Sequence, residues 1–375
     1  MENNDKHLQA AVTAARQRTL DWYGTMQAPG QPTGVSRISS AHDEKVWPGI
    51  LLPGTYNAVM GRALLDGLEG MTENERAELA AWIAGHCRDD GRFYIPGMLE
   101  GQVYKKDDPA ETWRYIDFHV TNYCLGALEY CAPDRVPNLA FAEPWLDPLH
   151  LKAWLADRDM RDPWQEGNNI VNLASFFLLL KKHHAVESGR VDTALCILLD
   201  WHDRLQEPAT GFWGVGQLSD PVRLLHALAG SMHNYHIWYA TGRPLPYQDK
   251  AVDRSLAYPA KIVSACIDVD LVDLLVHADR CIAYRHGEIE SWLRQLLQVL
   301  LDFQGNDGGF ADETSGTRRQ DGWVSGYQEP QGLSNTFATW FRWIAIAMIS
   351  DFLWPDWRIW HFRKMIGIGY RMEKK

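Results

Sequence analysis

Three aspartates lie close together in an otherwise apolar part of the chain. Asp268, Asp270 and Asp273 stand between the apolar residues 265–267 and 274–276. Neighbouring carboxylates in a low-dielectric environment cannot all ionise, so at least one should keep its proton near neutral pH and serve as a general acid. In the alternative interpretation Asp268 caps a helix and the other two acids face solvent. We favour the catalytic interpretation because burying acids without a use is costly.

Histidines and asparagines form further polar clusters at the edges of apolar segments. His233 and His236 are three residues apart and share a helix face, so they could polarise a hydroxyl, move a proton or bind a metal. Two histidines indicate a metal only weakly, and no metal is predicted. His119, with Asn122 and Tyr123, repeats the pattern earlier in the chain. The repetition predicts a common pocket.

Two more groups of residues could bind a substrate. Asn168 and Asn169 carry amides that suit hydroxyl recognition, although they could equally cap a helix. Arg342 is a lone cation in an apolar helix, which we expect to pair with a buried carboxylate or to hold a substrate anion. The predicted catalytic residues are Asp268, Asp270, Asp273, His233 and His236. The predicted substrate-binding residues are Tyr56, Asn57, His119, Asn122, Tyr123, Asn168, Asn169, Tyr235, Trp238, Asn335 and Arg342.

A recurring turn indicates how these residues are positioned. Three apolar runs end in a glycine-containing turn followed by Phe, at residues 87–93, 206–212 and 304–310. Glycine in such a position ends a helix. A unit that recurs over this length predicts a repeat architecture.

The periodicity of apolar residues predicts helices almost everywhere, and alternating strand patterns are scarce. Segments 75–86, 190–204 and 288–302 are amphipathic and suit an outer layer. Thr72 and Glu75 form a capping box before the first of them. We therefore expect an all-α protein.

Six further helices are apolar on nearly all sides and suit an inner layer. They are expected to begin near residues 54–57, 119–123, 167–169, 233–236, 268–270 and 334–336. Asn57 and Asn122, Asn169 and Asn234, and Asp270 and Asn335 are each 65 residues apart. Six inner and six outer helices predict one domain over residues 1–375, an (α/α)6 toroid whose inner helices start at one mouth of a central cavity. An open helical solenoid is the alternative.

Two stretches carry a resemblance to known families. Residues 300–310 (LLDFQGNDGGF) and 205–213 resemble the QW-type repeats of squalene-hopene cyclases, class II terpene cyclases and protein prenyltransferase β subunits. The resemblance implies an α/α toroid in which each such motif ends an outer helix. Residues 267–273 (IDVDLVD) also resemble the DxDD box of class II cyclases, in which an Asp protonates an alkene or epoxide. Asp268 and Asp270 match its first two acids, and a leucine replaces the last.

Composition limits the partners and the location. A net charge of −11 argues against nucleic acid, which requires a basic surface. The first ten residues lack an apolar signal region and no run of about 20 apolar residues occurs, so a cytoplasmic location is expected. The six cysteines form no CxxC pair and are interpreted as reduced core residues. No nucleotide-binding motif is present, and no cofactor is predicted.

The C-terminal residues 355–375 mix aromatic and basic side chains. We expect them to form an outer helix that docks on the ring. The alternative is a segment that contacts a membrane surface, which would suit a lipid substrate.

Three functions remain open. The first is a terpene-cyclase-like enzyme, an isomerase or lyase, in which Asp270 protonates an isoprenoid, Asp268 tunes it, and aromatic rings stabilise cations. The rings would come from Trp238, Tyr239, Phe337 and Trp340. The second is a carbohydrate-active (α/α)6 enzyme, a glycoside hydrolase, lyase or epimerase. The third is a ligand-binding toroid without catalysis. The 17 Trp, 14 Tyr and 12 Phe favour the first function.

Overall fold

The computed structural model describes residues 2–95, 109–161, 163–214, 220–313, 318–319, 327–330 and 332–372. These residues form twelve α-helices and only one two-stranded sheet, so the protein is all-α as expected. Six helices are inner helices: α2 (Leu51–Leu64), α4 (Pro109–Cys131), α6 (Pro163–Lys182), α8 (Pro221–Thr241), α10 (Ala265–Ile282) and α12 (Thr336–Leu353). The other six are outer helices: α1 (Glu2–Thr25), α3 (Glu73–Ala84), α5 (Pro148–Ala156), α7 (Ser188–Leu205), α9 (Gln248–Leu256) and α11 (His286–Phe303). The short elements are the 3-10 helices η1 (Pro48–Ile50) and η2 (Ala140–Leu146) and the antiparallel strands β1 (Arg318–Arg319) and β2 (Gln328–Glu329).

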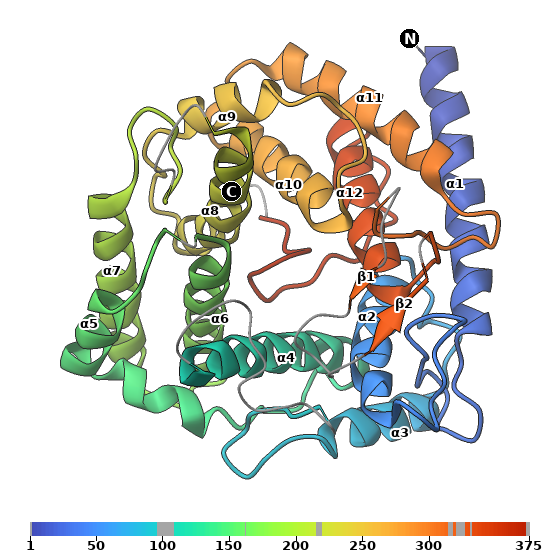
Figure 1. Ribbon diagram of the computed structural model, residues 1–375, viewed down its shortest axis with the longest axis horizontal. Coiled ribbons are helices and arrows are strands. Elements are labelled where there is room, and N and C mark those ends of the chain that lie inside the picture. Colours follow the sequence, from blue (N-terminus) through green and yellow to red (C-terminus); the bar gives the residue numbers. More distant parts are fainter. Residues whose placement is uncertain are drawn as a thin grey trace.

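The inner and outer helices alternate along the chain and occupy two layers (Figure 1). Each inner helix packs against the next, from α2 through α4, α6, α8 and α10 to α12, and α12 packs against α2. The inner helices are apolar on most sides because both of their faces are covered, whereas α7 and α11 bury one stripe of side chains. None of the helices in the described ranges has the length and apolarity that crossing a bilayer requires.

The three predicted amphipathic helices are confirmed as α3, α7 and α11, each displaced by no more than two residues at either end. The capping box is also confirmed: Thr72 Oγ1 accepts the Glu75 N–H, and the Glu75 carboxylate accepts the Thr72 N–H. Local sequence therefore determines these boundaries.

Two of the predicted helix starts are wrong. α4 begins at Pro109 and α8 at Pro221, so His119 and His233 lie within their helices and not at the first turn. For α8 the start is fixed by Asp220, whose side chain accepts the N–H groups of the first turn, and by the proline that follows. The polar clusters on these two helices are therefore held by regular helix on both sides.

A repeated hydrogen bond connects the glycine-containing turns to the inner helices. The described residues contain four such turns, one more than the sequence indicated. Each turn has a glycine with positive φ: Gly34 (93°), Gly91 (100°), Gly211 (76°) and Gly308 (96°). Two residues later a backbone N–H donates to a hydroxyl on the next inner helix. The pairs are Ser36 to Thr55 (3.0 Å), Phe93 to Thr121 (3.0 Å), Trp213 to Ser231 (2.9 Å) and Phe310 to Thr339 (2.9 Å). We call these four contacts the turn staples.

The C-terminal residues do not form the expected outer helix. Residues 354–372 contain no helix, and they enter the space that the six inner helices surround (Figure 1). The side chains of Met365, Ile366 and Ile368 are buried there. The proline at position 355 and two glycines with positive φ, Gly367 and Gly369, explain why this segment is irregular.

The cysteines differ in part from the expectation. All six are free thiols, and Cys124 and Cys131 are buried. Cys196 and Cys281, however, are exposed, because they lie on the outward face of α7 and near the end of α10.

Candidate functional site

Two histidine–aspartate pairs lie one helical turn apart between α8 and α10. His236 Nε2 is 2.8 Å from Asp273 Oδ1, and His233 Nε2 is 3.8 Å from Asp270 Oδ1. The pairs have the same separation in sequence, because both the histidines and the aspartates are three residues apart. All four side chains are buried. The spacing thus predicted correctly that His233 and His236 share a face.

In the pair nearer the carboxyl ends of the helices, Asp273 Oδ1 accepts two hydrogen bonds, while its Oδ2 has no partner among the described residues. Asp273 Oδ1 accepts from His236 Nε2 and also from His277 Nδ1, at 2.8 and 3.0 Å. The other ring nitrogens accept backbone N–H groups of the C-terminal segment: His236 Nδ1 from Gly367 and His277 Nε2 from Met372, both at 3.1 Å. Burial opposes the charge of Asp273, but the two histidines outweigh burial and lower the pKa of this carboxyl. Asp273 is therefore an anion and not a proton donor.

Two groups of side chains within the described residues have the spacing to hold a metal. One is His236, Asp273 and His277, which are buried, and the other is a mostly exposed cluster around Asp66. A metal would need a lone pair from each ring on the side of Asp273. The two C-terminal N–H groups require the lone pairs on the opposite side, so the hydrogens face Asp273. The arrangement suits a hydrogen-bonded cluster and not a metal centre.

The other pair has a different character. Asp270 is completely buried, and neither carboxylate oxygen has a hydrogen-bond partner among the described residues. Burial, reinforced by the charges of Asp273 and Asp268, raises the pKa of Asp270 well above its usual range. Burial likewise lowers the pKa of His233 to about 3, so this ring is neutral. The pair thus consists of a carboxyl whose protonated form is favoured by burial and an uncharged imidazole.

The third acid is held by a cation. Asp268 and Arg342 form a buried ion pair, and Arg342 also donates to the Asp312 carbonyl at 2.6 Å. The expectation that Arg342 pairs with a buried carboxylate is confirmed. Burial raises the pKa of Asp268 to about 6, with Arg342 acting in the opposite direction. The side chain that caps α10 is Ser264, so the capping role considered for Asp268 is wrong.

Three predicted binding residues come together on α2 and α4. The Tyr123 ring lies 4.3 Å from His119, 5.4 Å from Tyr56 and 5.3 Å from Trp340, measured between ring centroids. Burial lowers the pKa of His119 to about 3.

Other predicted binding residues have contacts that stabilise the fold. The Tyr235 hydroxyl donates to the Gly211 carbonyl of a turn (2.6 Å), and Trp238 packs against Trp213 and His202 in the outer layer. Asn335 caps α12 by accepting the Ala338 N–H at 2.8 Å.

The remaining predicted amides have mixed surroundings. Asn168 donates to the Trp164 carbonyl at 3.0 Å, and Asn169 to Glu166 at 3.4 Å. Asn122 accepts from Arg363 of the C-terminal segment at 2.7 Å. Asn57 is buried, and its Oδ1 has no partner among the described residues.

Sequence reasoning missed His277 and the whole C-terminal segment as parts of the site. His277 follows Asp273 by four residues, and this helical spacing was a signal that could have identified it. Arg363 gave no such signal, because Asn122, which it contacts, is 241 residues away in the sequence.

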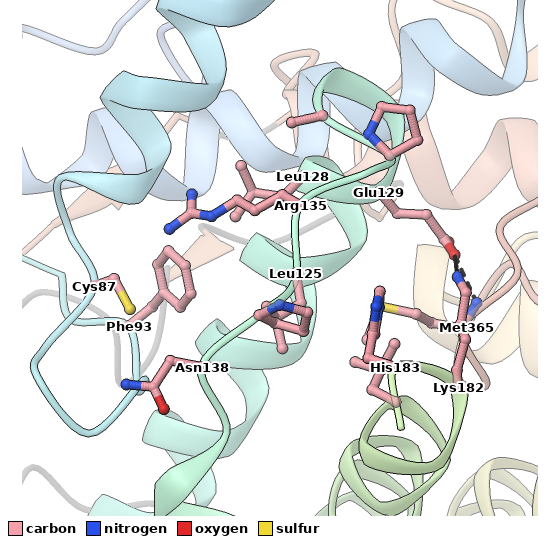
Figure 2. A pocket seen from close by; sticks show the side chains of 14 residues that line it. Cys87, Phe93, Leu125, Leu128, Glu129, Arg135, Asn138, Lys182, His183 and Met365 are labelled. Carbon is pink, nitrogen blue, oxygen red and sulfur yellow. Dashed lines mark hydrogen bonds and ion pairs between the residues drawn. The ribbon is translucent and has the colours of Figure 1, made fainter. Parts of the chain in front are cut away.

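A pocket lies away from these residues, between the end of α4, the end of α6 and the turn that contains Gly91 (Figure 2). Phe93, Leu125 and Leu128 form an apolar wall, with Arg135, Lys182 and Glu129 among the polar lining residues. None of the predicted site residues lines it. The pocket therefore does not contain the chemistry described above.

Comparison with known proteins adds no assignment: the chain matches no protein-family model, and no curated protein is similar to it.

Proposed function

We propose that the protein is a terpene-cyclase-like enzyme, a closed (α/α)6 toroid in whose centre Asp270 protonates an isoprenoid and so starts a cyclisation or rearrangement. The contact of α12 with α2 supports closure, because it connects the last inner helix to the first. The turn staples support a repeat of outer and inner helices, and the resemblance to QW-type repeats agrees with it.

The observation that carries the proposal is the buried, unpartnered carboxyl of Asp270. An alkene is a weak base, so its protonation requires an acid that keeps its proton at neutral pH and is not weakened by donating to other groups. In the proposed step the Asp270 O–H bond breaks, the alkene π electrons form a C–H bond, and a carbocation results. The carbocation loses a proton at the end of the reaction, and a proton returns to the Asp270 carboxylate, so that the acid is restored.

Neighbouring groups suit this step. His233 is neutral and lies 3.8 Å from Asp270, so it can stabilise the carboxylate left behind by donating a hydrogen bond after a small movement. The faces of Tyr56, Tyr123 and Trp340 offer the π electrons that stabilise a carbocation.

The carbohydrate-active alternative receives less support. Glycoside chemistry usually needs a second carboxyl that is free to act as base or nucleophile. Asp268 is paired with Arg342, and Asp273 accepts from two histidines. Chemistry that starts from a single acid therefore fits the site better.

Native protein and Asp270→Asn should be compared on a panel of isoprenoids, with and without diphosphate, and on a panel of oligosaccharides. We expect turnover of an isoprenoid that falls by a factor of about 10²–10⁴ in Asp270→Asn. The matched control is Asp192→Asn, which removes an acid of the surface pair with Lys181 that is 54% exposed. Equal turnover by native protein and Asp270→Asn would refute the proposal, and turnover of oligosaccharides alone would support the alternative.

A further inference from the structure

The C-terminal segment makes specific contacts with three inner helices. Arg363 donates to Asn122 on α4, the Gly367 N–H to His236 on α8, and the Met372 N–H to His277 on α10. Each of these contacts joins residues at least 95 positions apart in the sequence. The segment is therefore bound to the helices much as a separate peptide would be.

The shape of the segment fits this place. Gly367 and Gly369 have φ values of 117° and 83°, which only glycine adopts easily, and Arg363 and Tyr370, which flank them, form a parallel β-bridge. The Tyr370 ring is parallel to the His277 ring, at 6.4 Å and 5°. On α4 a Cβ at Gly126 would lie 3.2 Å from Arg363 Nη2, so the glycine leaves room for the guanidinium.

Asp273 determines which nitrogen of His236 and of His277 accepts a hydrogen bond from the segment. A neutral histidine has one N–H and one lone pair. Because Asp273 accepts the N–H of both His236 and His277, both lone pairs are directed away from it. They meet the N–H groups of Gly367 and Met372.

We propose that residues 363–372 form a latch across the carboxyl ends of the inner helices, and that Asp273 keeps the latch closed through His236 and His277. Asp270 and His233 lie one turn nearer the amino ends of the same helices, so the latch covers the two pairs on the side of the carboxyl ends. The latch does not depend on the enzymatic proposal, because its contacts involve neither Asp270 nor His233.

A second anchor provides a matched control. Asp351 on α12 forms ion pairs with Arg280 and with Arg371 of the latch. Asp351→Asn weakens this anchor while it leaves both histidine acceptors in place. Asp273→Leu has a different effect: it removes the oxygen that accepts from both rings, so that nothing holds the His236 lone pair toward Gly367, whereas His277 Nδ1 keeps the main-chain carbonyl of residue 273 as an acceptor.

The test is amide hydrogen exchange of the full chain, resolved at Gly367 and Met372. In the native protein both amides should be protected, and in Asp273→Leu the Gly367 amide should exchange about tenfold faster or more. In Asp351→Asn both should stay protected. Because Asp273→Leu removes a buried charge, His277→Phe is the second variant: it keeps a ring but removes the acceptor, so only the Met372 amide should lose protection.

Circular dichroism and the exchange of α4 amides identify variants that remain folded. The latch is refuted if Gly367 and Met372 exchange freely in the native protein. It is also refuted if both amides keep native protection in folded His277→Phe.

Discussion

The protonation state of Asp270 has a measurable consequence for stability. Because the folded-state pKa is raised above the unfolded value, the protonated form is favoured on folding, and the contribution of this group is full at low pH and is lost as the pH rises. The loss amounts to about 1.4 kcal/mol per pH unit between the two pKa values. No reduction for solvent screening is needed, because the side chain has no exposed surface. Asn has nearly the same shape and cannot ionise, so Asp270→Asn removes this dependence.

We therefore expect the free energy of unfolding of Asp270→Asn to increase relative to that of the native protein by about 1.4 kcal/mol per pH unit above pH 5, for as long as Asp270 keeps its proton in the folded state. Urea denaturation at pH 5, 6, 7 and 8 measures it, with Asp192→Asn as the surface control. The slopes against urea concentration should stay equal, which shows that the same surface is exposed on unfolding. If the stabilities of native protein and Asp270→Asn follow parallel curves from pH 5 to 7, Asp270 is already ionised and the reasoning fails.

Three further predictions concern the framework. Asp268→Asn should destabilise the protein by about 3–5 kcal/mol in urea denaturation because it leaves Arg342 buried and unpaired. The double variant Asp268→Asn/Arg342→Met should regain much of the lost stability. If it regains none, the ion-pair argument is contradicted. Gly308→Ala should lower the free energy of unfolding by about 1–3 kcal/mol or more, because its φ is 96° and the new Cβ would lie 2.4 Å from a backbone carbonyl oxygen of α1. Gly287→Ala should be nearly neutral, because no atom lies within 4 Å of the position of its new Cβ. Thr121→Val should cost about 1–3 kcal/mol by leaving a buried N–H without its acceptor, and an unchanged melting curve would show that this turn staple contributes nothing.

Much of the fold follows from local sequence. The amphipathic periodicity predicted the outer helices α7 and α11 almost to the residue, because one buried stripe determines each of them, whereas the start of α3 follows from its capping box. The capping box and the glycine turns marked helix ends for the same local reason. A fourth turn was missed, although Pro32-Thr33-Gly34 resembles the later turn that ends at Gly211.

The site was only partly predictable. The spacing of His233 and His236 correctly placed both rings on one face of their helix. It could not show that one pair is hydrogen-bonded and the other is not, because that difference depends on His277 and on the C-terminal segment. Contacts between residues that are 95 to 241 positions apart in the sequence leave no periodic signal in it.

The most direct test of the account is the carboxyl ¹³C NMR titration of aspartate-labelled protein, in which the Asp270 signal is assigned by its absence from Asp270→Asn. The account predicts that this signal stays at the position of a protonated carboxyl from pH 5 through pH 7, while Asp273 stays at the position of a carboxylate throughout. An Asp270 signal at the carboxylate position at pH 7 would contradict it.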